Sequence, residues 1–142
     1  MKKQFLALLL VLGVMTLLQG CAAKIDQVGL QVQLVKLERK ADGSLLASLL
    51  FSNPNVGSRN VAKSSHQLTL NGKLAGELDI VEPLGLPALQ TATTTVTLKR
   101  ASGAAEVTGS VSYQLASLLT LSVYDDNIQR YKTSSSGTVV VQ

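Results

Sequence analysis

The feature that most constrains this chain is a period-two alternation of apolar and polar residues, which recurs along most of its length. In the first such run, Val28, Leu30, Val32 and Leu34 alternate with glycine and glutamine. Side chains of a β-strand point to opposite faces in turn, so this pattern predicts a strand with one buried face and one wet face. Val, Thr and Ser also outnumber Glu and Lys, which favours strands. We expect an all-β protein.

Two turn signals separate pairs of such runs. Asp42-Gly43 precedes a second apolar strand at 44–52. Asn71-Gly72 lies between alternating runs at 66–70 and 73–81, and Asn-Gly is the strongest short-range sign of a hairpin because both turn positions need positive φ. The alternation places Leu68 and Leu70 on one face. It also places Leu74, Leu78 and Ile80 together on one face.

The remaining segments predict shorter strands joined by loops. We expect strands at 91–99, 107–115, 128–132 and 138–141, loops at 56–65, 82–88 and 133–137, a short strand within 60–63, and a tight turn at 124–128. Residues 116–121 fit either one helical turn or a strand. About seven or eight short strands with regular turn signals predict a β-sandwich.

The N-terminus has the pattern of an export signal. Lys2 and Lys3 precede an apolar stretch at 5–18, which is too short for a typical membrane-spanning helix. Leu18-Gln19-Gly20-Cys21 follows and resembles the bacterial lipobox, whose cysteine receives a diacylglyceryl group. We therefore expect a signal peptide at 1–20, lipidation of Cys21, a lipidated tether at 21–27 and one domain at 28–142. The alternatives are a plain signal peptide with an incidental cysteine, or an uncleaved anchor.

The single cysteine and the charge bound the possible partners. With one thiol the chain forms no internal disulfide. Acyl chains such as palmitate on Cys21 would make the membrane its first partner. Ala22 is not the aspartate that commonly retains lipoproteins in the inner membrane, so in a Gram-negative source we expect the outer membrane, facing the periplasm. Loss of Lys2 and Lys3 lowers the formal charge from +4 to +2. No basic run is interleaved with aromatic residues, so we expect no nucleic-acid binding.

The triplet Asn53-Pro54-Asn55 ends the strand at Ser52. Pro54 has no N–H to donate to a ladder and favours extended backbone at Asn53. The asparagine side chains can bond to nearby backbone groups instead. The simplest interpretation is a strand stop that crosses to the second sheet, and contact with a partner is the alternative.

The stretch 50–77 resembles the late-embryogenesis-abundant type 2 (LEA_2) family, whose diagnostic form is the water-stress and hypersensitive-response (WHy) domain. The resemblance rests on an apolar strand ending in Asn-Pro-Asn, a hairpin turning on Asn71-Gly72, the following Gly76, and a closing strand that contains Gly137. His66 stands where the family often has an aromatic residue before the hairpin.

The resemblance implies an immunoglobulin-like antiparallel β-sandwich and a role outside catalysis. Its members are linked to desiccation and other stresses, so the leading hypothesis is a lipid-anchored protein that protects envelope proteins or membrane when water is scarce. The second hypothesis is a scaffold lipoprotein that holds an envelope protein through sandwich edges or loops.

The chain shows no pattern typical of a catalytic or metal site. His66 is the only histidine; Ser64 and Ser65 lie beside it, but no Gly-x-Ser-x-Gly motif is present. Its parity with Leu68 predicts packing at a sheet margin. Asp125-Asp126 lacks the spacing of a calcium loop. We expect no enzyme activity, no cofactor and no metal.

Overall fold

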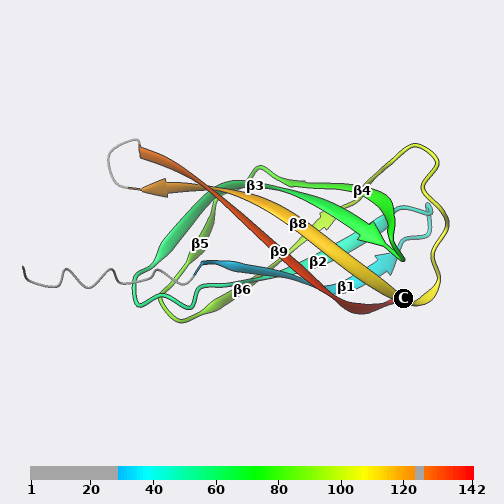
Figure 1. Cartoon of the computed structure of the whole chain (residues 1–142), viewed down its shortest axis with the longest axis horizontal. Coiled ribbons are helices and arrows are strands. Elements are labelled where there is room, and N and C mark those ends of the chain that lie inside the picture. Colours follow the sequence, from blue (N-terminus) through cyan, green and yellow to red (C-terminus); the bar gives the residue numbers. More distant parts are fainter. Residues whose placement is uncertain (1–28, 124–126) are drawn as a thin grey trace, which may run out of the picture.

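The computed structural model describes residues 29–123 and 127–142, and its elements there are all β-strands (Figure 1). The all-β expectation is confirmed. No helix that could span a bilayer occurs among these described residues. The expected signal peptide, Cys21 and the tether lie outside the described residues.

The strands are β1 Gln31–Arg39, β2 Leu45–Ser52, β3 Arg59–Leu70, β4 Lys73–Ile80, β5 Leu84–Leu86, β6 Thr91–Thr97, β7 Lys99–Arg100, β8 Gly109–Val123 and β9 Asn127–Val141.

These nine strands form one curled, mixed sheet, a half-barrel with the order β6-β2-β1-β9-β8-β3-β4-β7, and β5 pairs with β3. All neighbours are antiparallel except β1 and β9, which meet in parallel at Leu37 and Val141. The Gln142 amide donates to the Leu37 carbonyl at 3.0 Å, and the Gln142 carbonyl accepts from the Arg39 amide at 2.7 Å. This short junction joins the strands β6, β2 and β1 to the strands from β9 to β7. The sequence had instead predicted a purely antiparallel sandwich of about seven strands.

The molecule has two ends, which the strand register defines. Gln31 pairs with Ser52, and Ser52 pairs with Thr91, so β1 begins where β2 ends and β6 begins. Gly29 therefore lies at this end, which we call the tether end. The C-terminal residue Gln142 lies at the opposite, far end, where Figure 1 marks the C-terminus.

The core lies inside the curl, where both groups of strands contribute side chains. Apolar side chains with no exposed surface are Leu37, Ala47, Leu49, Phe51, Leu68, Leu78 and Leu119. Each large one stabilises the fold by about 2 kcal/mol through removal from water.

The short strand predicted within 60–63 is part of a longer one, and the predicted loop at 56–65 is wrong from Arg59 onward, because β3 begins there. A register shift between Val61 and Lys63 inserts one extra residue, so Val61 before it and Ser64 after it are both buried. This bulge breaks strict alternation, and the polar residues then look like a loop.

A second bulge corrects the predicted face of β4. Leu68 pairs with Gly76 while Thr69 pairs with Leu74, so Ala75 is the extra residue. The parity changes there, and Leu74 is 48% exposed while Leu78 is buried. The Leu68 and Leu70 face is confirmed, since both side chains are buried.

The C-terminal third is simpler than predicted. Residues 116–121 belong to β8, not to a helical turn, and β9 runs unbroken through the predicted loop at 133–137. The reason is a continuous ladder, in which β8 pairs with β9 from Gly109 and Val141 to Val123 and Asn127. Regular pairing overrides the loop-like Ser and Gly composition. Residues 124–126 lie outside the described residues.

Replacing Gly76 with alanine is expected to destabilise the fold. A Cβ at Gly76 would lie 2.1 Å from the Lys99 carbonyl oxygen, a backbone atom of β7, and the φ of Gly76 is +155°. We expect G76A to lower the free energy of unfolding by about 2 kcal/mol or more in urea titration. The matched control is G85A, since a Cβ at Gly85 has no atom within 4 Å. Equal stability of the two variants would contradict the assigned close approach.

Candidate functional site: the Asn53 corner and the His66 cluster

Asn53 is a buried amide at the end of β2, with 2% of its surface exposed. Its Nδ2 donates to the carbonyls of Gly57 at 2.9 Å, Leu86 at 3.1 Å and Pro87 at 3.1 Å. Its Oδ1 accepts from the backbone amide of Asn55 at 3.1 Å and from the Asn55 side chain at 3.0 Å. The amide has two protons for three carbonyls, so one N–H is shared between two acceptors.

Backbone bonds complete the connection between the two loops. The Asn53 amide donates to the Gln90 carbonyl at 2.9 Å, and the Leu89 amide donates to the Asn55 carbonyl at 3.0 Å. Residues 53–58 and 86–90 are therefore held as one unit, which we call the Asn53 corner. Pro54 is exposed on it and takes no part in these bonds.

The Asn53 corner presents apolar side chains to water. Val56 is 86% exposed and Leu89 is 68% exposed. Leu89 also has a φ of +56°, a left-handed conformation that costs a residue with a Cβ about 1 kcal/mol. The bonds around Asn53 hold Leu89 in this conformation although its side chain packs little within the fold.

The Asn71-Gly72 turn forms the hairpin that the sequence predicts. Its φ values are 49° at Asn71 and 77° at Gly72, as the turn requires. The Asn71 amide also donates to the Ser112 carbonyl at 2.9 Å, and the Asn71 Oδ1 accepts from the Ser112 amide at 3.0 Å. Asn71 thus fixes the start of β8 to the hairpin, a role that sequence reasoning missed because Ser112 lies far along the chain.

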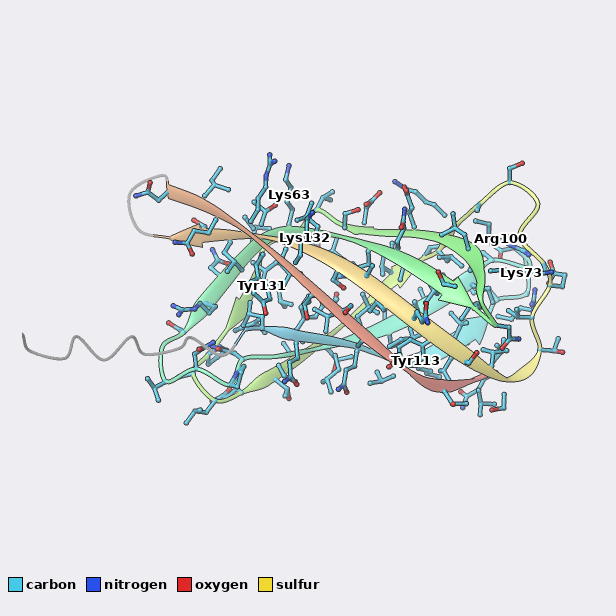
Figure 2. All side chains as sticks on the ribbon, in the orientation of Figure 1. Lys63, Lys73, Arg100, Tyr113, Tyr131 and Lys132 are labelled. Atoms are coloured by element: carbon cyan, nitrogen blue, oxygen red, sulfur yellow. The ribbon has the colours of Figure 1, made fainter. Side chains whose placement is uncertain are left out.

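Gly137 and Gly29 make room for tyrosine rings. Gly137 pairs with Tyr113, and a Cβ at Gly137 would lie 3.0 Å from the ring of Tyr113. A Cβ at Gly29 would lie 1.4 Å from the Tyr131 hydroxyl. Figure 2 labels both tyrosines on the two long strands, Tyr113 toward the far end and Tyr131 toward the tether end.

His66 lies in the middle of the sheet, which corrects its predicted place at a sheet margin. It is 1% exposed, and its strand partners are Leu78 on β4 and Ser117 on β8. Its Nδ1 is 2.7 Å from Ser117 Oγ, and its Nε2 is 2.9 Å from Ser64 Oγ. Its ring packs edge-to-face on Phe51 of β2, with centroids 5.8 Å apart. We call Ser64, His66 and Ser117 the His66 cluster.

Burial keeps the imidazole neutral. Desolvation lowers the pKa of His66 to about 4, against a weaker opposing effect of the Asp79 carboxylate. A neutral ring donates through one nitrogen and accepts through the other, which matches the two serine hydroxyls. The hydrogen-bonding groups of the cluster therefore satisfy one another inside the fold.

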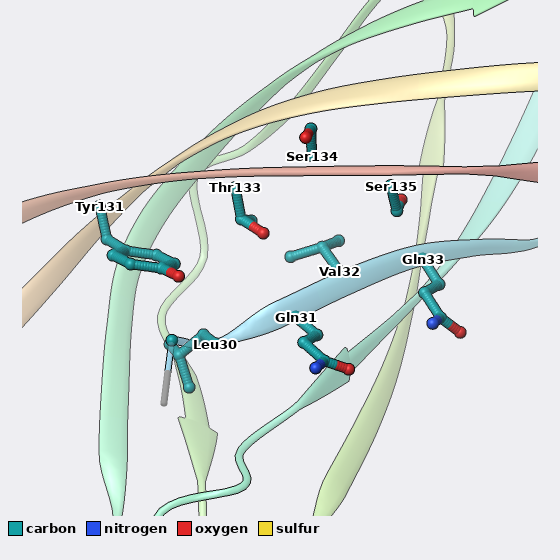
Figure 3. Close-up of a pocket in the computed structure, with 9 residues that line it drawn as sticks. Leu30, Gln31, Val32, Gln33, Tyr131, Thr133, Ser134 and Ser135 are labelled. Carbon is teal, nitrogen blue, oxygen red and sulfur yellow. The ribbon is translucent and has the colours of Figure 1, made fainter. Parts of the chain in front are cut away.

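A cleft opens where β1 and β9 diverge toward the tether end (Figure 3). Its volume is about 420 Å³. Its lining includes Gln31 and Gln33 from β1 and Tyr131, Thr133 and Ser135 from β9. Ser135 Oγ is buried and has no hydrogen-bond partner among the described residues. The cleft offers hydroxyl and amide groups and no charged side chain.

Cationic side chains are spread over several strands of the sheet. Figure 2 labels Lys63 on β3 and Lys132 on β9, and it labels Lys73 and Arg100 toward the far end. In residues 29–123 and 127–142, no three His, Cys, Asp or Glu side chains are grouped so that they could hold a metal ion. Cys21 and Asp125-Asp126 lie outside these ranges.

The comparisons with known proteins bear on the fold alone. No family model and no curated protein matches the sequence. The solution structure of AT1g01470 from Arabidopsis thaliana is similar, with a TM-score of 0.52 and 20% identity over 79% of this chain and 79% of that chain. A crystal structure of an Archaeoglobus fulgidus protein has a TM-score of 0.45 and 13% identity over 78% of this chain and 95% of that one. The solution structure of At2g46140.1, a protein proposed to be late embryogenesis abundant, has a TM-score of 0.43 and 14% identity over 98% and 85%. The similarity to AT1g01470 places this chain in a known class of all-β folds.

Substitutions at Asn53 are expected to lower stability in a fixed order. N53A removes the side-chain donor from the buried Leu86 carbonyl and from the part-buried carbonyls of Gly57 and Pro87, so we expect the free energy of unfolding to fall by about 3 kcal/mol in chemical denaturation. N53D keeps the shape but directs a carboxylate oxygen at those carbonyls, and should cost more. The control N55A removes one part-buried side-chain bond and should cost about 1 kcal/mol or less. An equal loss of stability in N55A and N53A would contradict the role of Asn53 in joining the two loops.

The stability of the fold is expected to fall with pH in the range where His66 titrates. The unfolded chain binds a proton near pH 6.5, whereas the folded chain resists until about pH 4. Unfolding therefore takes up a proton between these values, and the free energy of unfolding should fall by about 3 kcal/mol from pH 7 to pH 4 because of this group. H66Q, which retains one donor and one acceptor, should lose correspondingly less over the same range. If the free energy of unfolding falls equally with pH in the natural protein and in H66Q, His66 is not the group responsible.

Proposed function

We propose that this chain is a lipid-anchored, non-enzymatic protein that protects envelope proteins or membrane under desiccation and related water stress. The observation that carries the proposal is the combination of a lipobox-like Cys21 with the Asn-Pro-Asn and Asn-Gly pattern of the LEA_2 and WHy family. The immunoglobulin-like relationship that the pattern implies is part of the proposal.

The geometry of the described residues supports a protein that acts by contact. The family pattern builds a rigid corner at Asn53 and a hairpin fixed by Asn71 to β8. The single histidine is enclosed between two serines, and burial lowers its pKa to about 4, which makes it a weak proton acceptor. What the fold offers to other molecules is surface: exposed apolar and uncharged polar side chains on rigid strands and loops.

The anchor would be supplied by the acyl chains on Cys21. Each buried methylene contributes about 0.8 kcal/mol, and stable anchoring takes more than one chain, which the diacylglyceryl group provides. Ala22 after the cysteine favours the outer membrane in a Gram-negative cell, with the domain facing the periplasm.

The proposal predicts that protection depends on the anchor. In a desiccation-sensitive bacterium, the natural chain should raise survival after drying, because it holds a contact surface at the envelope. C21S should lose most of this effect, whereas the control variant T108S, at an exposed position, should keep it. Mass spectrometry of the mature N-terminus and membrane fractionation should show the acyl groups. Unchanged survival with the acylated protein present at the envelope would count against the proposal.

A second candidate function, a scaffold that holds an envelope protein, is favoured by β6. This strand ends the sheet order, pairs with β2 over its whole length, and has neither proline nor charge. Such an edge is a template for an added strand from a partner. Recovery of one stoichiometric partner crosslinked through β6 would support this candidate over general protection.

A further inference from the structure

The tether end carries most of the strongly exposed apolar surface of the described residues. Of the four large apolar side chains with the highest exposure, Val56 at 86%, Leu89 at 68% and Ile128 at 68% lie there. The remaining one is Val81, which directly follows β4 and is 78% exposed. A folded domain in water gains nothing from placing such side chains at the tips of its loops.

The two most prominent of these side chains are presented by a rigid support. Val56 lies between Asn55 and Gly57, whose carbonyls accept bonds from Leu89 and Asn53. Leu89 is held in a left-handed conformation while its side chain faces water. Strain at an exposed leucine, maintained by a buried amide, indicates that the side chain contacts something outside this fold.

The position of the tether indicates that the contact is with the membrane. Gly29 lies at the same end as the Asn53 corner, and Cys21 is eight residues before it. Even fully extended, those eight residues span about 28 Å. A lipid on Cys21 therefore keeps the Asn53 corner, rather than the far end, close to the bilayer surface.

The charge of the corner fits a bilayer surface. Residues 53–58 and 86–90 contain no charged side chain, and the residue that follows the first of these loops is the cationic Arg59. Apolar groups flanked by polar and cationic groups are suited to the boundary between lipid headgroups and acyl chains, which in bacterial envelopes carries negative charge.

We propose that the Asn53 corner is a membrane-contact tip: Val56 and Leu89 insert into the headgroup region of the bilayer that holds the lipid anchor, and β8 and β9 point the far end away from it. This inference rests on the proposed lipid anchoring and deepens it. It gives the domain a fixed orientation at the membrane, with the C-terminal end free for other molecules.

A tryptophan reporter tests the tip directly, since the chain contains no tryptophan. The acylated mature chain carrying V56W is reconstituted into vesicles of phosphatidylethanolamine and phosphatidylglycerol. We expect blue-shifted emission and quenching by brominated lipids. The matched control L74W, at an exposed leucine of the far end, should keep the emission of a water-exposed indole. Water-like emission from V56W overturns the proposal, and so does photocrosslinking from position 56 to a protein instead of lipid.

A second variant separates membrane contact from stability. L89G removes the side chain and relieves the left-handed strain, so thermal stability should be kept or raised. In the V56W background, L89G should nevertheless reduce lipid quenching by about twofold, since one of two apolar contacts is lost. Unchanged quenching in the stably folded variant contradicts insertion of Leu89.

Failure of the anchor and failure of the tip give different results. If mass spectrometry finds Cys21 without acyl groups, the proposed anchoring fails. The processed V56W chain, as the cell makes it, is then added to the same vesicles. A vesicle-dependent blue shift still supports the tip, and its absence overturns it.

Discussion

The hydrogen bonds of one buried amide organise the tether end of this protein. Asn53 follows β2 and joins its own loop to the end of β5 and the residue after it, through the carbonyls of Gly57, Leu86 and Pro87. The β2 ladder stops before them, because Pro54 has no N–H to donate. The side chain thus replaces a sheet where the sheet ends, and the positions of Val56 and Leu89 follow from it.

The far end of the molecule is held by different means. The parallel junction at Leu37 and Val141 is the only pairing between β1 and β9, and ion pairs from Arg39 and Arg100 to Glu106 lie near it. These ion pairs are partly exposed and contribute little to the stability of the fold. Toward the tether end β1 and β9 diverge, which leaves the polar cleft beside Tyr131. The two ends therefore differ chemically: one carries charged pairs, and the other carries exposed apolar tips and an open seam.

The sequence was sufficient for features whose causes are local. Alternation predicted the strands, and Asn71-Gly72 predicted the hairpin, because turn geometry depends on those two residues. The sequence was insufficient where a residue far along the chain determines the register of a strand or the place of a side chain. Nothing in the sequence identifies Ala62 and Ala75 as bulge residues. The bulge at Ala62 interrupts the alternation of β3, and the bulge at Ala75 leaves Leu74 exposed. His66 looked marginal because its serine partner on β8 is 51 residues away. The Asn-Pro-Asn triplet indicated a strand stop, but not that Asn53 would hold a segment more than 30 residues later.

The central physical claim is that Asn53 makes two surface loops as rigid as the sheet. Amide hydrogen exchange of the folded protein, measured residue by residue, tests it most directly. The Leu89 amide should exchange about as slowly as amides of β2, since its bond to Asn55 opens only when the corner does. Exchange of Leu89 at the rate of an exposed loop, while β2 stays protected, would contradict the claim.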